Sequence, residues 1–411
     1  MIDARWWTEA RFGLFIHWGI YAVAGRHEWV KERERLSDER YQRYFTHFFP
    51  DLFDPAAWAR EARLAGMRYF VVTTKHHDGF CLWDSDLTDY KVTNTPWGRD
   101  LLGPMVEAFR AEGLRVGFYH SLLDWHHPEF PVDGLHPQGD DPDFVAAAAG
   151  RDIGRYADYL HGQVHELLTR YGSIDYLFFD FSYADRFWGG KGAADWRSEE
   201  LLAMVRSLQP GALVNDRLGI PGDFVTPEQY QPAAPVEREG RRVLWEACQT
   251  LNGSWGYDRD NRDFKTPAQV VRMLVDGVSK DGNLLLNVGP TGRGQFDSEA
   301  VRILREIGEW MSMHERSIRG CGASGVGFTP PTDCRYTQSA SGDRLYVHFF
   351  AWPFRHAHLP GLASRVEYAQ FLHDASEVQM TTSVDSDTLT LHLPTIAPPV
   401  HVPVVELFLR T

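Results

Sequence analysis

Cysteine is scarce in this sequence. The 411-residue chain has only four cysteines, none with a Cys-x-x-Cys partner: Cys81, Cys248, Cys321 and Cys334. Their scatter argues against a zinc cage and against a disulfide scaffold. The chain also lacks any run approaching about 18 apolar residues, the length that spans a membrane. Residues 1–7 have neither the charged start nor the apolar stretch of a signal peptide. We therefore expect a soluble protein located in the cytoplasm.

Positive charge is also in short supply. Lys and Arg total 42 against 56 Asp and Glu, which gives a formal net charge of −14 at pH 7. On average such a surface repels the phosphates of nucleic acids and anionic membranes. We therefore expect neither a nucleic acid nor a membrane as a partner, and the composition leaves a homo-oligomer open.

Metal-binding and nucleotide-binding motifs are missing as well. His76 and His77 are adjacent and so lack the His-x-His spacing of metal-dependent barrel hydrolases, and the chain has no His-Glu-x-x-His motif. No Gly-x-Gly-x-x-Gly or P-loop pattern is found either. We expect an enzyme that uses no metal and no other cofactor.

Aromatic residues are abundant, with 14 Trp and 25 Phe in the chain. Aromatic faces cover the C–H surface of sugar rings. A large aromatic core explains the same composition equally well, so this observation needs support from motifs.

Short apolar runs alternate with helical stretches up to about residue 320. This alternation is typical of a parallel sheet wrapped by helices, and seven to eight such runs match a (β/α)8-like TIM barrel. The runs are Phe12 to Trp18, Arg68 to Lys75, Leu114 to His120, Ile174 to Phe181, Ala212 to Asp216, Val243 to Cys248 and Gly282 to Val288. Helices are predicted near Asp54 to Gly66, Asp100 to Glu112 and Pro267 to Lys280. We assign residues 1–320 to a catalytic barrel domain.

The pattern changes after residue 320. Stretches with alternating apolar and polar residues appear, such as Arg344 to Phe349 and Thr388 to Leu393, and alternation of this kind predicts antiparallel strands with one buried face. Asp385 to Asp387 fits a hairpin turn between two of them. We assign residues 321–411 to a C-terminal antiparallel β-sandwich domain.

Asp180 is the strongest catalytic candidate from the residues alone. It ends the run Tyr176 to Asp180, which is apolar enough to be buried on both faces. Active sites of barrels form at the carboxyl ends of the strands. A carboxylate there must be paired or take part in chemistry, because burying it alone in a low dielectric is costly. A buried Asp tied to a neighbouring Arg is the alternative.

If the chemistry at Asp180 is the hydrolysis of a glycoside, a second carboxylate is needed. Glu228 lies in a loop after the run that ends at Asp216, where it could approach a glycosidic oxygen from the rim of the barrel. Glu246, next to Trp245 at another predicted strand exit, is the competing acid/base candidate. The residue types and spacing alone do not separate the two.

Seven stretches in register resemble glycoside hydrolase family 29, the α-L-fucosidases. Each alone would be a weak signal, whereas seven in order are specific. They are RFGLFIHWG (11–19), EW (28–29), TTKHHDGF (73–80), YHSLLDW (119–125), NDR (215–217), SWGY (254–257) and GNLLLNVGP (282–290).

The resemblance implies a role for each candidate residue. Asp180 corresponds to the nucleophile and Glu228 to the acid/base, with Glu246 as runner-up. Arg217 corresponds to a residue near the nucleophile, and Phe178 and Trp245 could wall the 6-methyl group of fucose. The remaining substrate-binding residues implied are His17, Glu28, Trp29, His76, His77 and Tyr119.

The activity implied is that of an exo-acting retaining α-L-fucosidase. It would release terminal α-L-fucose from fucosylated oligosaccharides or glycoconjugates through a covalent fucosyl-enzyme on Asp180. Two alternatives stay open at this point: a related retaining glycosidase for another sugar, and a carbohydrate-binding relative that has lost catalysis. The presence of both Asp180 and Glu228 speaks against the second alternative.

Overall fold

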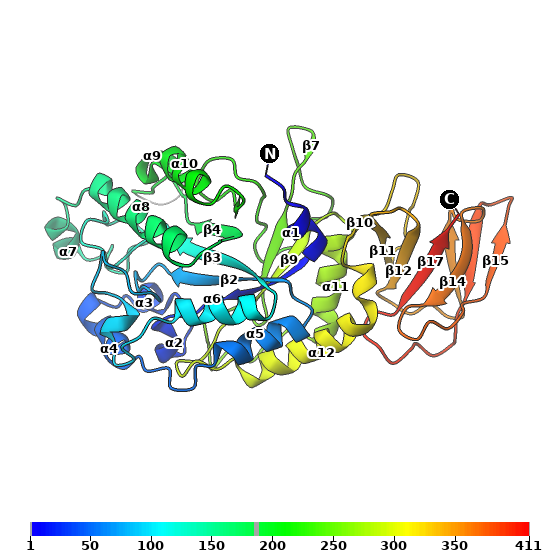
Figure 1. Cartoon of the computed structure of the whole chain (residues 1–411), viewed down its shortest axis with the longest axis horizontal. Helices are drawn as coiled ribbons and strands as arrows, with labels where there is room; N and C mark the ends of the chain where they lie inside the picture. Colours follow the sequence, from blue (N-terminus) through cyan, green and yellow to red (C-terminus); the bar gives the residue numbers. More distant parts are fainter. Residues whose placement is uncertain (1, 185–188, 411) are drawn as a thin grey trace.

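A computed structural model describes residues 2–184 and 189–410 of the chain. A curled parallel sheet wrapped by helices occupies most of the molecule, and antiparallel sheets lie at one end, beyond α11 (Pro267–Val278) and α12 (Ser298–His314) (Figure 1). The predicted fold class, a TIM barrel followed by an antiparallel sandwich, is confirmed. Within the described residues, no helix has the length and apolar character needed to cross a membrane.

Seven parallel strands form the curled sheet in the order β5-β4-β3-β2-β1-β9-β8. Each falls within or overlaps one of the seven predicted runs. They are β1 (Phe12–Ile16), β2 (Tyr69–Lys75), β3 (Arg115–Ser121), β4 (Tyr176–Asp180), β5 (Leu213–Val214), β8 (Glu246–Thr250) and β9 (Asn283–Val288). One prediction is wrong in position: the run Val243 to Cys248 becomes a strand that only begins at Glu246. Glu246 therefore stands at the entrance of its strand, not at its exit.

An irregular segment joins the two edge strands of this sheet. Phe224 forms a parallel bridge with Asn215, directly after β5, while Val225 and Glu228 form parallel bridges with Trp245 and Cys248 on the β8 side. The backbone hydrogen bonds agree, because Asp223 N–H donates to Val214 and Glu246 N–H donates to Val225. Residues 223–229, which we call the closing segment, thus close the barrel where a regular eighth strand would lie. Glu228, which was predicted to lie in a loop, lies in this closing segment and forms a bridge with Cys248 of β8.

Helices cover the outside of the sheet. Asp54 caps α5 (Pro55–Leu64) by accepting from the N–H of Ala57 at 2.9 Å, with Pro55 at the first position, as the sequence predicts. Thr266 and Gln269 form a capping box at the start of α11. Among the described residues, the other helices before residue 320 are α1 (Arg5–Ala10), α2 (Tyr21–Ala24), α3 (Val30–Arg33), α4 (Asp38–Thr46), α6 (Leu102–Ala111), α7 (Pro142–Ala147), α8 (Ile153–Arg170), α9 (Ala193–Trp196) and α10 (Ser198–Leu208), with 3-10 turns η1 (Val92–Asn94) and η2 (Glu315–Ser317).

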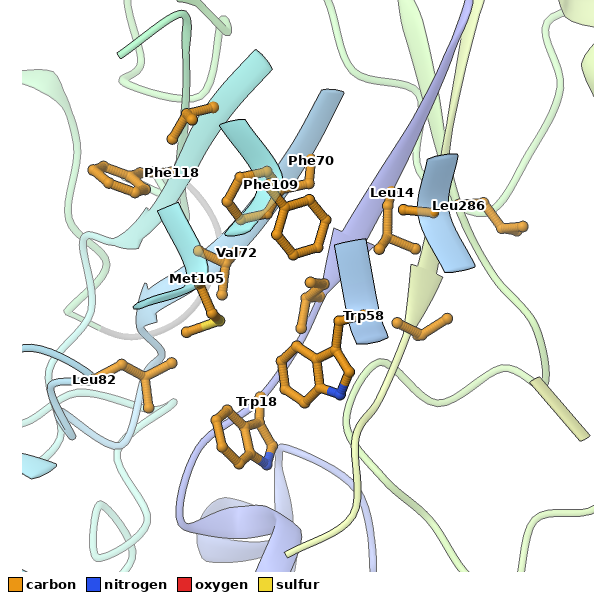
Figure 2. Packing of buried hydrophobic residues seen from close by; sticks show 14 of the residues in the cluster. Leu14, Trp18, Trp58, Phe70, Val72, Leu82, Met105, Phe109, Phe118 and Leu286 are labelled. Carbon is orange, nitrogen blue, oxygen red and sulfur yellow. The ribbon is translucent and has the colours of Figure 1, made fainter. Parts of the chain in front are cut away.

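Alternate residues of each strand serve two different cores. Outward-facing side chains such as Leu14, Phe70 and Val72 pack against helices, and Phe70 stacks on Phe109 of α6 with ring centroids 3.8 Å apart (Figure 2). Inward-facing side chains form a separate core inside the barrel. Because successive side chains on a strand point to opposite faces, a residue two positions before an active-site residue faces the same interior.

The C-terminal strands form two antiparallel sheets that share one apolar core. The first sheet comprises β10 (Cys321–Ala323), β11 (Cys334–Ser339), β12 (Arg344–Phe349), β17 (Val404–Leu409) and β14 (Val366–Phe371), and the second β13 (His356–Pro360), β16 (Thr388–His392) and β15 (Met380–Ser383). β15 and β16 form the predicted hairpin around Asp385 to Asp387. The boundary between residues 320 and 321 stays a prediction.

Candidate active site

A cavity of about 350 Å³ lies at the carboxyl ends of the barrel strands. Its lining includes nine of the residues singled out in the sequence. They are His17, Trp29, His76, His77, Tyr119, Phe178, Asp180, Arg217 and Glu228.

Asp180 is the last residue of β4 and is held by two donors. The hydroxyl of Tyr119 donates to Oδ2 at 2.8 Å, and Nη1 of Arg217 donates to Oδ1 at 2.7 Å. Burial alone raises the pKa of Asp180, but the charge of Arg217 and the two hydrogen bonds outweigh it and hold the pKa below its usual value. The side chain is therefore an ionised and oriented carboxylate at neutral pH.

Arg217 brings the two candidate carboxylates together. The same Nη1 atom lies 2.7 Å from Oδ1 of Asp180 and 2.7 Å from Oε2 of Glu228. These two oxygens are therefore separated by at most twice that distance, about 5.4 Å. Retaining glycosidases place their two carboxyl groups about 5–5.5 Å apart, whereas inverting enzymes need roughly 6.5–9.5 Å. The upper limit lies below the range of inverting enzymes, so this geometry favours a double displacement.

His17 on the inner face presents a hydrogen-bond acceptor. Its Nδ1 lies 2.7 Å from Oδ1 of Asn287, whose Nδ2 donates to the carbonyl of Trp255 at 2.7 Å. Oδ1 must then accept, so Nδ1 of His17 carries the hydrogen. Burial lowers the pKa of His17 to about 4, so the ring is neutral near pH 7 and Nε2 can accept from a hydroxyl.

His77 is also a neutral imidazole with an unprotonated Nε2, but its Nδ1 has a different hydrogen-bond partner. The hydroxyl of Ser121 donates to the carbonyl of Leu123 at 2.9 Å, so it accepts from Nδ1 of His77 at 2.6 Å. Burial lowers the pKa of His77 to about 4. Its unprotonated Nε2 lies 4.0 Å from Oδ2 of Asp180. Two neutral imidazoles therefore offer acceptors to the hydroxyls of one ligand.

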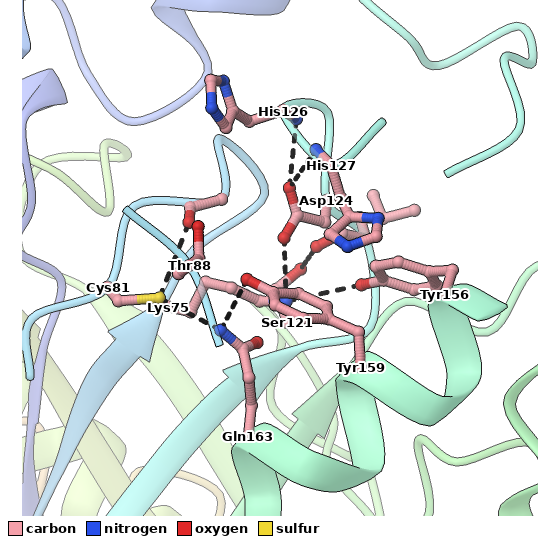
Figure 3. Close-up of polar contacts among 12 residues, drawn as sticks. Lys75, Cys81, Thr88, Ser121, Asp124, His126, His127, Tyr156, Tyr159 and Gln163 are labelled. Carbon is pink, nitrogen blue, oxygen red and sulfur yellow. Dashed lines mark hydrogen bonds and ion pairs between the residues drawn. The ribbon is translucent and has the colours of Figure 1, made fainter. Parts of the chain in front are cut away.

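A buried ion pair supports the loop that positions His77 (Figure 3). Nζ of Lys75, at the end of β2, donates to Oδ2 of Asp124 at 3.1 Å, and both side chains are almost fully buried. Oδ1 of Asp124 accepts from the N–H groups of His126 and His127. In addition, the N–H of Trp125 donates to the carbonyl of His77 at 2.8 Å. The exits of β2 and β3 are thereby tied together behind the cavity.

The remaining predicted residues differ in their placement. His76 stacks on Tyr119 with ring centroids 5.7 Å apart, and Trp29 packs edge-on against His77. Phe178 lies beneath the guanidinium of Arg217, 4.9 Å from the ring centroid. Glu28 is buried and accepts from the N–H of Gly256 at 2.7 Å, and it is not among the cavity-lining residues. Its predicted contact with a sugar hydroxyl stays a prediction.

Trp245 and Glu246 lie away from the cavity, which corrects their predicted placement. Glu246 is fully buried and accepts from Tyr69, from Tyr176 at 2.7 Å and from the indole of Trp7 at 3.2 Å. These tyrosines begin β2 and β4, so Glu246 occupies the end of the barrel opposite Asp180. Trp245 points outward, and its indole donates to the carbonyl of Lys280. Because β8 begins later than predicted, Trp245 and Glu246 lie near the amino-terminal end of the barrel, far from the cavity at the carboxyl ends of the strands.

The environment of Glu246 predicts a pH-dependent stability. Burial raises its pKa from 4.5 to about 7 despite three hydrogen-bond donors. Because the folded-state pKa lies above the unfolded one, the protonated carboxyl group of Glu246 stabilises the fold at low pH. This stabilisation is lost as pH rises through about 7. The free energy of unfolding should fall by roughly 2–3 kcal/mol between about pH 5 and pH 8 relative to Glu246→Gln, which cannot ionise. Urea unfolding of both proteins at several pH values measures this, and a pH-independent difference would contradict it.

Four cavity residues were not predicted from the sequence: Phe15, Phe181, Cys248 and Trp255. Phe15 precedes His17 by two positions and Trp255 lies in the SWGY stretch, so strand alternation and the motif were usable signals. Phe181 has a φ of 79°, in the left-handed region that a bulky residue rarely adopts. No sequence signal reveals that conformation, which places a strained residue directly after Asp180. Among the described residues, no group of three or more His, Cys, Asp or Glu side chains is arranged to hold a metal ion.

Comparisons with known proteins agree on one family. A family model described as Alpha-L-fucosidase matches residues 3–316. The structure of α-L-fucosidase isoenzyme 1 from Paenibacillus thiaminolyticus is similar with a TM-score of 0.93 and 47% identity, covering 99% of both chains. The curated α-L-fucosidase of Dictyostelium discoideum is 28% identical over 446 aligned positions, covering 99% of this chain and 92% of the relative.

A third relative bears on the reaction. The structure of the family 29 α-L-fucosidase of Bacteroides thetaiotaomicron is similar with a TM-score of 0.86 and 28% identity. The match covers 98% of this chain and 95% of the relative. Its structure is described as a trapped covalent intermediate in complex with 2-fluoro-fucosyl fluoride, obtained with a glutamate-to-glutamine variant. A covalent intermediate is the mark of a retaining mechanism. Motifs, fold and relatives lead to one conclusion: the chain belongs to the α-L-fucosidases of glycoside hydrolase family 29.

Proposed function

We propose that this protein is an exo-acting retaining α-L-fucosidase that removes terminal α-L-fucose from fucosylated oligosaccharides or glycoconjugates. Asp180 is the nucleophile and Glu228 the acid/base. The observation that carries the proposal is the shared contact of Arg217 Nη1 with both carboxylates, which limits the separation of the two oxygens to about 5.4 Å.

In the first step, Oδ of Asp180 attacks the anomeric carbon while Glu228 protonates the departing glycosidic oxygen. The low pKa of Asp180 supports its role, since the nucleophile must be ionised. In the second step, Glu228 removes a proton from water, which attacks the same carbon and releases Asp180. Each displacement inverts the anomeric configuration, so the product retains that of the substrate.

The cavity walls suit a deoxy sugar. The acceptors on His17 and His77 would take hydrogen bonds from hydroxyls of the ring, and neutral imidazoles do so without the cost of desolvating a charge. Phe15, Phe178 and Trp255 line the same cavity and offer apolar surface for the 6-methyl group. Discrimination against a sugar with one extra hydroxyl should be limited, about 10- to 200-fold in rate, because apolar pockets reject such analogues weakly.

Stereochemistry and sugar choice together test this function. Proton NMR during hydrolysis of nitrophenyl α-L-fucoside should show α-L-fucose as the first product, before mutarotation forms the β anomer. The nitrophenyl glycosides of α-L-galactose and β-D-fucose should be cleaved more slowly. First appearance of the β anomer would refute double displacement, and faster cleavage of another glycoside would identify a different sugar.

A further inference from the structure

We propose that the protein has a binding site for the leaving group, built for a neutral sugar that stacks on Tyr230. This inference rests on the proposed function and extends it from the fucose cavity to the rest of the substrate. The site is a groove of about 1240 Å³ next to the cavity. Both spaces are lined by Asp180, Phe181, Arg217 and Glu228.

The position of Glu228 gives the groove its role. The acid that protonates the glycosidic oxygen must lie beside that oxygen, and the leaving group continues away from the fucose on the same side. Glu228 stands where the two spaces meet, and 40% of its side chain is exposed. The groove continues beyond Glu228, away from the fucose cavity, so it lies where the leaving group would extend.

Charge pairing in the groove favours a neutral ligand. Asp216 forms an ion pair with Arg238, and the guanidinium of Arg217 is shared between Asp180 and Glu228. Among the described residues that line the groove, each charged side chain therefore already has an ionic partner within the protein. Ser182 and Thr226 also line the groove, and hydroxyl groups exchange hydrogen bonds readily with those of a sugar.

Tyr230 provides the aromatic face. It is 59% exposed, unusually open for a large ring, and it lines the groove two residues after Glu228. Gln229 between them is anchored, because its Nε2 donates to Oγ1 of Thr250 at 2.8 Å and its Oε1 accepts from the N–H of Thr250 at 3.2 Å. Gln229, the last residue of the closing segment, is thus anchored to β8 between Glu228 and Tyr230 and holds the backbone of both neighbours in place.

The experiment compares substrates with and without a sugar as leaving group. α-L-Fucosyl fluoride loses a single atom that cannot reach Tyr230, whereas fucosyl disaccharides place a second ring in the groove. A panel of α1,2-, α1,3-, α1,4- and α1,6-linked disaccharides covers the possible linkages. Tyr230→Ala should lower kcat/KM roughly five- to tenfold on the best disaccharide and leave the fluoride within about twofold, the range expected for losing one ring contact.

Two further variants serve as controls. Tyr230→Phe keeps the ring and should retain activity on both substrates, and Tyr368→Ala removes a partly exposed tyrosine of the sandwich and should change neither. An unchanged disaccharide rate in Tyr230→Ala, an equal loss on both substrates, or a sulfated second sugar cleaved as fast as a neutral one would overturn the inference. Failure of the unmutated protein to hydrolyse the fluoride would instead overturn the proposed function, and the inference with it.

Discussion

Asp180→Ala is expected to lower kcat for fucoside hydrolysis by at least about 10⁴-fold, because it removes the covalent step outright. The fold should survive, since Arg217 keeps Glu228 as an ionic partner at 2.7 Å. Steady-state kinetics with nitrophenyl α-L-fucoside measure the loss, and thermal unfolding monitors the fold. A matched control is Asp158→Ala, which removes an exposed carboxylate of α8 and should leave kcat unchanged.

Added azide sharpens this test. In Asp180→Ala, azide can occupy the space of the missing carboxylate and attack the anomeric carbon once, which inverts the configuration and yields β-fucosyl azide. Ordinary turnover in this variant, or release of the α anomer of the azide, would contradict the assignment of Asp180 as nucleophile.

Glu228→Ala should lower kcat on a fucosyl disaccharide by about 10²- to 10⁴-fold, because a sugar leaving group needs protonation. A nitrophenol leaves without help, so the fucosyl-enzyme should still form and then wait for a nucleophile. Azide needs no general base and should restore turnover with nitrophenyl α-L-fucoside. Two successive inversions would then give α-fucosyl azide, opposite to the product expected from Asp180→Ala.

Glu246→Ala provides the comparison for Glu228→Ala. Its carboxyl group is enclosed by Tyr69, Tyr176 and Trp7 at the far end of the barrel, so its removal should destabilise the fold without creating azide dependence. Azide rescue in Glu246→Ala, together with its absence in Glu228→Ala, would exchange the two roles.

Much of the site could be predicted from short-range patterns. The run Tyr176 to Asp180 is a strand because it is continuously apolar, and a carboxylate at its exit falls where barrels place their chemistry. His17, His77 and Tyr119 follow the same logic on neighbouring strands. Each of these side chains depends on the strand that carries it, and a strand's exit can be located from its own residues.

Trp245 and Glu246 show where this reasoning fails. The sequence around them contains the apolar residues of a strand, but where the pairing begins depends on the neighbouring strand. Glu246 pairs with Asn283, the first residue of β9, and this register lowers Glu246 to the entrance of the barrel. Strand alternation does predict that Glu246 and Cys248 face the same interior, yet it carries no information about depth.

The sequence by itself determined the strand and helix pattern, the exit position of Asp180 and the family, because these depend on neighbouring residues and on motifs. Only the tertiary structure decided which carboxylate stands beside Asp180. Glu228 reaches it because residues 223–229 bridge the two edges of the sheet and a single arginine nitrogen contacts both acids. Barrel closure and strand register are set by contacts between segments far apart in the chain, and no local pattern encodes them.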